Sequence, residues 1–364
     1  MVPIAWRNLF QDKLRLAISI EGVALSIMLV LLLSGFLNGV YRQITAYVDN
    51  TPASFYVTQK GVANFQGAGS IIPRSAARKV EAVEGVTSAV PVFAQYGILE
   101  LHGKKVTTFL VGYEPALGGG PWRLTEGRAV EDIDDVVVDR VLAQRHGLRL
   151  GDRIDILSGR FRIVGLSEDT ASWMVSMVFL RHDAATALLR AQDATSLILV
   201  NGEASLTAQR LRDALPDFSV VTRETVAAND TSLFASILST PLRMMVVIAV
   251  GIGALLVGLT IYSATVERVR EYGVLKAVGM RNRTLYGIVA RQALGAAALG
   301  FVVGLVLVWL AAAGIQRAWP QFLVVIDRSS ILQAGIGALM MALLASLLPA
   351  RYVGGIDPAR IFRR

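Results

Sequence analysis

The stretch LAISIEGVALSIMLVLLLSGFLNGV, residues 16–40, decides what kind of fold this chain can adopt. Its only ionisable side chain is Glu21. About 20 helical residues cross the roughly 30 Å of hydrocarbon in a bilayer, so we expect a transmembrane helix here. Three further apolar stretches follow at residues 244–264, 284–314 and 331–348. The sequence therefore predicts four membrane spans, one before and three after a long polar segment.

The overall composition supports this frame. Hydrophobic residues make up 54% of the 364 residues and charged residues 18%, where ordinary soluble domains have roughly 25% charged. The mean hydropathy is +0.52. The chain has no cysteine, which excludes disulfides, thiolate metal sites, iron–sulfur clusters and a cysteine nucleophile.

Residues 41–243 have the composition of a globular domain. Alternating apolar residues predict a strand at 54–60, and a helical pattern runs from 73 to 85. Two separate strands are expected next, at 86–91 and 96–101.

A second β-α-β pattern lies near the end of this segment, with strands at 196–200 and 219–222 and a helix at 206–215. The residues between the two patterns, about 121–189, read as short strands joined by polar turns. We therefore predict an integral membrane α-helical protein with a large extracytoplasmic α+β domain that contains an inserted β-rich subdomain.

The net charge of +8 is not evenly distributed. Residues 41–242 carry 20 basic and 22 acidic side chains, and the remainder carries 16 and 6. A nucleic-acid-binding module would concentrate its basic excess on the polar domain, so binding of nucleic acid is not expected. Here the excess flanks the apolar stretches, which is the pattern of membrane topology.

Positive charge predicts the orientation. The short loop 315–330 contains only two basic residues, Arg317 and Arg328. Thirteen basic residues flank the other ends of the spans: Arg7, Lys13, Arg15, Arg268, Arg270, Lys276, Arg281, Arg283, Arg291, Arg351, Arg360, Arg363 and Arg364. Since cytoplasmic loops are enriched in Lys and Arg, we expect both termini, the loop 265–283 and the tail 349–364 in the cytoplasm, and the large domain outside.

The N-terminal flank leaves two questions open. Residues 1–15 read either as an amphipathic helix on the cytoplasmic membrane surface or as an extension of the first span. A cleaved signal peptide is disfavoured, because the apolar stretch exceeds the usual 7–15 residues and no small-residue cleavage site follows before Asp49. Glu21 is expected at the cytoplasmic interface near Arg15, with a proton-relay role as the alternative.

The polar segment offers no recognisable catalytic, cofactor or metal site. His102, His146 and His182 lack any metal-ligand spacing, and we expect each at the surface. The acidic run 131–135 lacks the glycine and closing glutamate of a calcium loop, so a solvated turn is expected. The segment therefore favours a binding or coupling module.

The loop after the second span reads ERVREYGVLKAVGMR, residues 267–281. Its spacing predicts a short helix that ends at Gly279, in the position after the C-cap. Val274, Leu275, Ala277 and Val278 would then lie exposed in the cytoplasm, where this chain has no domain to cover them. A separate cytoplasmic partner follows, with a connector lying on the membrane surface as the alternative.

These residues also carry a family resemblance. Glu-Arg-x-Arg-Glu-Tyr-Gly-Val-Leu-Lys-Ala-Val-Gly resembles the signature of the FtsX-like, MacB-type permeases of ABC transporters, a group that includes the DevC, LolC and MacB permeases. Pro349-Ala350-Arg351 and Asp357-Pro358-Ala359-Arg360 resemble the family's ending. Glu126-Gly127-Arg128 and Leu150-Gly151-Asp152 resemble its inserted subdomain. The one-plus-three arrangement of spans also matches, so the resemblance covers the whole chain.

The resemblance implies partners and a mechanism. ATP and Mg²⁺ would bind a separate MacB- or LolD-like cytoplasmic ATPase, and this chain would hold no cofactor of its own. The permease would pair with a second copy or a paralogue and contact lipid and, in some members, a periplasmic adaptor or carrier. The ATPase-coupling residues would be Glu267, Arg268, Arg270, Glu271, Gly273, Val274, Leu275, Lys276, Ala277, Gly279 and Arg281. Separately from the resemblance, the spacing of Gly300 and Gly304 in the third span predicts close packing against another helix.

The expected function is that of a non-enzymatic permease in the bacterial cytoplasmic membrane. A partner's ATP hydrolysis would move the extracytoplasmic domain and drive export or extraction of a lipid, lipoprotein, peptide or drug. Apart from Glu21 and Arg291 the spans hold no ionisable residue, which argues against a polar channel. The alternatives are activation of a periplasmic or cell-wall enzyme by the same stroke, and a membrane sensor without an ATPase.

Overall fold

The computed structural model describes residues 12–172, 175–202 and 204–355. The chain divides into two compact units. The first, here called the helical unit, comprises Met1–Asn38, Leu238–Trp319 and Leu323–Arg364. The second, here called the sheet unit, comprises Gly39–Ile237 and Pro320–Phe322.

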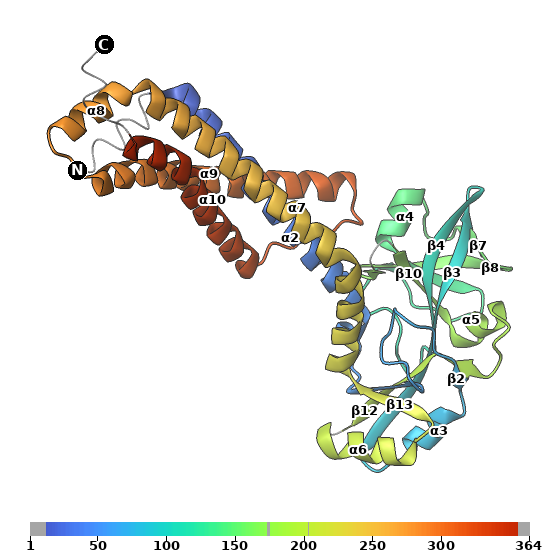
Figure 1. Ribbon diagram of the computed structural model, residues 1–364. Helices are drawn as coiled ribbons and strands as arrows, with labels where there is room; N and C mark the ends of the chain where they lie inside the picture. Colours follow the sequence, from blue (N-terminus) through green and yellow to red (C-terminus); the bar gives the residue numbers. More distant parts are fainter. Residues whose placement is uncertain (1–11, 173–174, 203, 356–364) are drawn as a thin grey trace. The chain divides into compact units, whose positions relative to one another are not determined.

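The helical unit is built from four long helices and one short helix (Figure 1). Their bounds are α2 Lys13–Asn50, α7 Arg223–Glu267, α8 Val269–Ala277, α9 Asn282–Ala318 and α10 Arg328–Gly354. The four long helices are each long and apolar enough to cross a membrane. Each extends beyond the span that the sequence predicts, and α2 and α7 contribute residues to both units.

The helical unit is apolar inside and outside. Val23 and Ile27 of α2, Val257 of α7, Val289 of α9 and Met341 of α10 share one buried core. The outward side chains are also large and apolar: Leu255 is 70% exposed and Trp309 77%. So much exposed apolar surface is unfavourable in water and is expected where lipid replaces water.

Two glycines let α9 approach α2 closely. A Cβ added to Gly300 would lie 2.5 Å from the Cβ of Val23. A Cβ added to Gly304 would lie 2.9 Å from the carbonyl oxygen of Ala24 and from the Cβ of Ile27. The predicted packing pair thus lies where any larger residue would collide with the neighbouring helix.

The sheet unit contains thirteen described strands and four described short helices. The strands are β1 Phe55–Gln59, β2 Ile72–Pro73, β3 Val86–Leu101, β4 Lys104–Tyr113, β5 Leu124–Gly127, β6 Asp135–Asp139, β7 Arg153–Ile156, β8 Gly159–Ser167, β9 Ala171–Ser172, β10 Val175–Arg181, β11 Ala194–Thr195, β12 Leu197–Gly202 and β13 Phe218–Thr222. The helices are α3 Ala76–Glu81, α4 Arg140–His146, α5 His182–Leu188 and α6 Ala204–Ala214.

The single long strand β3 connects the two parts of the sheet. The sheet order is β13-β1-β12-β3-β4-β10-β6-β8-β5, with β7 and β9 paired off this path. The sequence predicts two strands where the structure has the single 16-residue strand β3. Its first half pairs with β12 and its second half with β4, so the strands of the insertion at about 121–189 join the same sheet.

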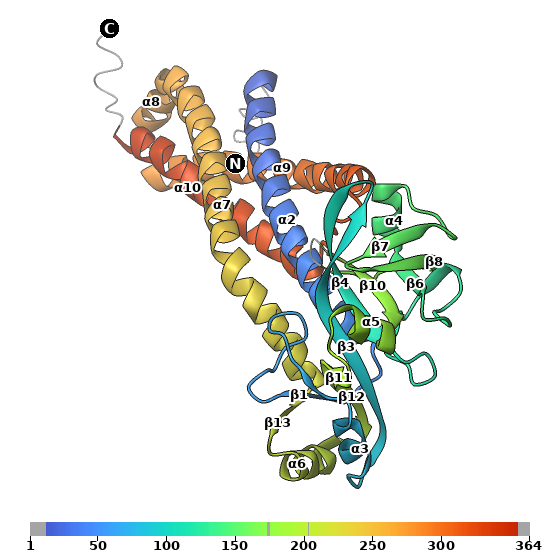
Figure 2. The ribbon, with the colours of Figure 1, turned by 90° about the vertical axis from the view of Figure 1, so that its right-hand side faces the viewer.

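Both faces of this sheet are covered, as the alternation of its strands requires. Along β12, Ile198 and Val200 pack with α3 and α6, which lie together beside β12 and β13 (Figure 2). Leu197 and Leu199 point to the opposite face, where they share a core with Tyr47 of α2. The end of α2 therefore packs on one face of the sheet, and the two short helices α3 and α6 pack on the other.

Two predicted features lie outside the described residues. One is the amphipathic helix of residues 1–15, apart from its last four residues. The other is the family-like end of the tail at residues 357–360.

Candidate functional site

The segment predicted to couple to a partner forms a distinct helix, α8, directly after α7 (Figure 1). Gly279 has a φ of +91°, in the left-handed region. The N–H of Gly279 donates to the carbonyl of Lys276 at 2.9 Å, and that of Met280 to the carbonyl of Leu275 at 3.0 Å. These two bonds define a Schellman motif, so the predicted helix end at Gly279 is confirmed.

One face of α8 packs inward. Tyr272 is 3% exposed and belongs to the core of the helical unit. Gly273 is buried beside it, and Leu275 and Met280 pack against the same core. Gly273 and Leu275, both predicted as coupling residues, therefore lie on the inner side of α8, and the predicted exposure of Leu275 is wrong because this side chain packs against the core.

The opposite face of α8 is exposed and partly apolar. Val274 is 46% exposed and Val278 84%. Four further exposed predicted residues complete this face: Arg270, Glu271, Ala277 and Arg281. We call these six residues the α8 outer face. All of these residues are exposed, and all except Val278 belong to the predicted coupling set.

Two polar contacts lie near the two ends of α8. The Nζ of Lys276 donates to the carbonyl oxygen of Gly354, in α10, at 2.8 Å. Just before α8 begins, Arg15 of α2 donates to the carboxylate of Glu267, the last residue of α7. Lys276 and Glu267 are thus engaged within this chain, which the sequence could not indicate because their partners lie 78 and 252 residues away.

A small recess lies beside the Arg15–Glu267 pair and is lined in part by Ser19, Thr260 and Gln292. The hydroxyl groups of Ser19 and Thr260 lie 2.6 Å apart and join α2 to α7. Arg15 also pairs with Asp12 at 3.0 Å. Glu21, expected near Arg15, is exposed and has no ion pair among the described residues.

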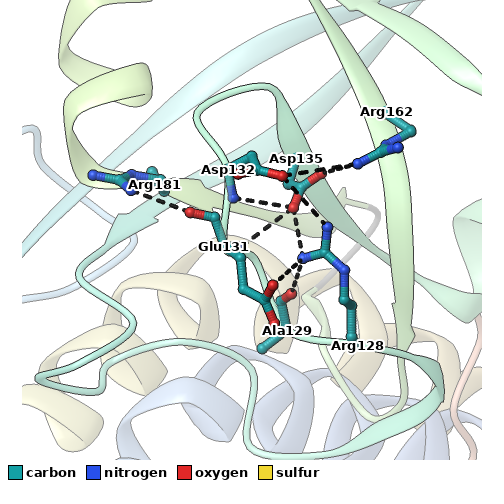
Figure 3. A network of polar contacts seen from close by, with 7 residues as sticks. All are labelled: Arg128, Ala129, Glu131, Asp132, Asp135, Arg162 and Arg181. Atoms are coloured by element: carbon teal, nitrogen blue, oxygen red, sulfur yellow. Dashed lines mark hydrogen bonds and ion pairs between the residues drawn. The ribbon is translucent and has the colours of Figure 1, made fainter.

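The acidic run 131–135 is not a simple solvated turn (Figure 3). Asp135 is fully buried. It accepts hydrogen bonds from Arg128 at 2.7 Å, Arg162 at 3.2 Å and the backbone N–H groups of Glu131 and Asp132. Burial opposes ionisation of Asp135, but these four donors outweigh it and lower its pKa. Two arginines already balance this cluster, so it does not resemble an open cation site.

One histidine differs from expectation. His182 is 2% exposed, whereas the sequence predicts a surface residue. It opens α5 and meets Phe93 edge-on with ring centroids 6.3 Å apart. Neither ring nitrogen has a hydrogen-bond partner in the described part of the chain. Burial lowers the pKa of His182 to about 4, with the charge of Arg74 acting in the same direction.

Two family models together match most of the chain. Residues 16–218 match the MacB-like periplasmic core domain, and residues 243–358 match the FtsX-like permease C-terminal domain. The chain belongs to the MacB/FtsX-type ABC transporter permeases. The predicted family resemblance and fold class are thereby confirmed. The protein is a membrane protein with an extracellular domain.

Similar proteins span the same length. An uncharacterized ABC transporter permease of Mycobacterium tuberculosis strain H37Rv is 27% identical over 367 residues, covering 100% of this chain and 99% of the relative. A Staphylococcus epidermidis protein named as a candidate hemin transport system permease, HrtB, is 19% identical and covers 98% and 97%.

Among solved structures, the periplasmic region of MacB from Actinobacillus actinomycetemcomitans aligns with a TM-score of 0.38 at 15% identity. It covers 50% of this chain and 94% of that one.

Proposed function

We propose that this permease converts ATP hydrolysis by a separate cytoplasmic ATPase into movement of the sheet unit, which drives export or extraction of an amphiphilic substrate. ATP and Mg²⁺ bind the partner. The permease acts as a dimer, with both termini in the cytoplasm, and an adaptor or carrier outside receives the substrate where one is used.

The observation that carries this proposal is the geometry of α8. Its inner face packs in the core through Tyr272, and Lys276 ties it to α10. Directly before α8, the last residue of α7, Glu267, pairs with Arg15 of α2. A force applied to the α8 outer face therefore reaches the long helices through packed and hydrogen-bonded contacts. Val278, at 84% exposure, is the apolar side chain on α8 that most needs a partner.

Two further observations support the route of transmission. Only α2 and α7, among the described helices, have residues in both units, so they are the continuous elements available to carry a displacement. The predicted spans offer no row of ionisable side chains that could line a polar path. Movement of the sheet unit is then the available way to act on a substrate.

An amphiphilic substrate is favoured over an ion or a sugar for the same reason. Hemin, which the name of the staphylococcal relative mentions, belongs to this chemical class. Activation of an extracytoplasmic enzyme by the same movement remains the alternative function, and substrate release distinguishes the two.

The test is the ATP hydrolysis of the purified complex in lipid nanodiscs. Val278→Asp places a charge at the centre of the apolar contact, so we expect stimulation of the ATPase by the permease to be lost. Ile71→Asp is the matched control, since Ile71 is 57% exposed and lies in the sheet unit. Full stimulation in Val278→Asp would contradict the assignment of the α8 outer face.

A further inference from the structure

A loop of the sheet unit, residues 63–67, lies between the sheet and the two long helices. Phe65 stacks on Tyr47 of α2 with ring centroids 4.4 Å apart. The same ring meets Phe109 of β4 edge-on at 5.2 Å. One side chain of this loop therefore contacts both a long helix and the sheet.

Asp230 holds the loop from the side of α7. Its carboxylate is fully buried and accepts hydrogen bonds from the backbone N–H of Phe65, at 3.0 and 3.2 Å, and of Gln66, at 3.1 Å. The preceding residue, Asn229, donates from Nδ2 to the carbonyl of Ala63 at 2.7 Å. Two adjacent residues of α7 thus form hydrogen bonds near both ends of the loop.

Gln66 holds the loop from the other side. Its Nε2 donates to the carbonyl of Ile44, in α2, at 2.9 Å. Its Oε1 accepts from the hydroxyl of Ser172 in β9, and its carbonyl accepts from the hydroxyl of Tyr96 in β3 at 3.3 Å. Gln66 therefore joins α2, α7 and two strands of the sheet.

The Asp230 carboxylate has no basic partner among the described residues. A buried charge is costly to hold, and backbone N–H groups alone compensate it here. Apolar packing at this position would be less costly. It would restrict rotation and sliding of α7 less than directional hydrogen bonds do, and these bonds fix one register of α7 against loop 63–67.

The position of Asp230 along α7 makes this register matter. The helix begins at Arg223, directly after β13, so Asp230 lies about two turns, or roughly 10 Å, from the chain junction. A single covalent junction lets a helix pivot about its end. A second attachment two turns away converts a rotation of α7 into a displacement of the loop and the strands bonded to it.

We propose that Asp230 and Gln66 form a joint that carries displacement of α7 and α2 into the sheet. They are positioning residues that act through loop 63–67. The inference rests on the proposed function, because it names the place where that movement enters the sheet unit.

The test uses the full chain in complex with its ATPase in nanodiscs, followed by hydrogen–deuterium exchange with and without ATP and vanadate. Asp230→Asn keeps the shape of the side chain and removes its charge. Asp49→Asn is the matched control, because Asp49 is exposed on α2 and accepts a hydrogen bond from the hydroxyl of Thr45 within the same helix. Gln66→Met is a second variant that tests the joint if Asp230→Asn fails to fold.

We expect the amides of Phe65 and Gln66 to exchange about tenfold faster in Asp230→Asn, the factor that one charge-assisted hydrogen bond represents. If Asp230 only stabilises the loop, this faster exchange is the whole expected effect. The joint also predicts that the nucleotide-dependent change persists in residues 223–237 and is lost from β3 and β9, the strands bonded to the loop, while ATP hydrolysis continues. Gln66→Met should interrupt transmission in the same way, and Asp49→Asn should leave it intact.

A nucleotide-dependent change that still reaches β3 and β9 in Asp230→Asn, or in Gln66→Met if the first variant does not fold, would overturn the joint. The wild-type complex separates the two levels of the argument. If ATP changes no exchange in the sheet unit of the wild type, the proposed function itself is wrong and the joint falls with it.

Discussion

The Lys276 ammonium donates a hydrogen bond of 2.8 Å to the carbonyl oxygen of Gly354, which ties α8 to the last turn of α10. Carbonyls in the last turn of a helix lack intrahelical partners, and a lysine is a suitable donor for them. A nearby contact adds to the same junction, since Tyr262 of α7 and Tyr352 of α10 meet edge-on at 5.3 Å. The helix that we propose contacts a cytoplasmic partner is thus anchored to the long helices.

Replacing this donor should separate binding from coupling. Lys276→Met keeps the α8 outer face, so the ATPase should still co-purify, while permease-stimulated ATP hydrolysis falls severalfold. The lost bond should cost about 1 kcal/mol at this partly exposed site, and exchange across residues 269–277 should rise about fivefold. Lys276→Arg retains a donor and should behave almost as the wild type. Full stimulation in Lys276→Met would show that the anchor is dispensable.

The turn after α8 depends on the backbone of Gly279. A β-branched residue at a φ of +91° is strained, so Gly279→Val should destabilise the helix end by about 1–2 kcal/mol. Amide exchange of Gly279 and Met280, the two donors of the motif, measures this directly. Gly287→Ala is the control: this glycine lies inside α9 with no atom within 4 Å of an added Cβ, and the change should be neutral or stabilising.

Contact between α2 and α9 depends on the absence of side chains. Gly300→Val would place its Cβ about 2.5 Å from that of Val23, so the helices must separate. We expect a loss of about 1–3 kcal/mol, the range typical of overpacking, seen as a lower thermal midpoint in detergent. Gly251→Val meets no atom within 4 Å and should leave the midpoint nearly unchanged. Equal midpoints for the two variants would refute close packing at Gly300.

The buried His182 predicts acid sensitivity of the sheet unit. Its folded-state pKa of about 4 lies below the usual 6.5, so the unfolded chain binds the extra proton between these values. Stability should therefore fall as the pH drops from about 6.5 to about 4, by on the order of 2–3 kcal/mol, and this dependence should end below pH 4.

His182→Leu removes both the proton uptake and two unpartnered ring nitrogens. Denaturant unfolding of the full chain at pH 7 and pH 4.5 should show a smaller difference for this variant than for the wild type. His102→Leu, at an exposed turn, is the control and should keep the wild-type difference. An unchanged acid sensitivity in His182→Leu would assign it to other groups.

The features that the sequence predicted correctly are local ones. Apolar length located the four long helices, and the glycine at 279 located the end of α8. Alternation located β1, β12 and β13 to within a residue or two. These signals act within one helix or strand, so a single sequence contains them.

The features that the sequence missed depend on distant partners. Nothing near residues 86–101 indicates one strand, because its two halves pair with different neighbours, β12 and β4. Asp230 reads as a surface carboxylate in a polar stretch until loop 63–67 is placed against it. Helical spacing likewise predicted the exposure of Val278 but could not show that Lys276 points inward, since that depends on where α10 ends.

The central claim, that work enters this protein from the cytoplasm through α8, is tested most directly by labelling a single cysteine at position 278. The chain has no cysteine of its own, so Val278→Cys reports without background. With a membrane-impermeant maleimide we predict no labelling in intact cells, labelling in inverted vesicles that lack the ATPase, and protection when the ATPase is bound. Labelling in intact cells, or equal labelling with and without the ATPase, would contradict it.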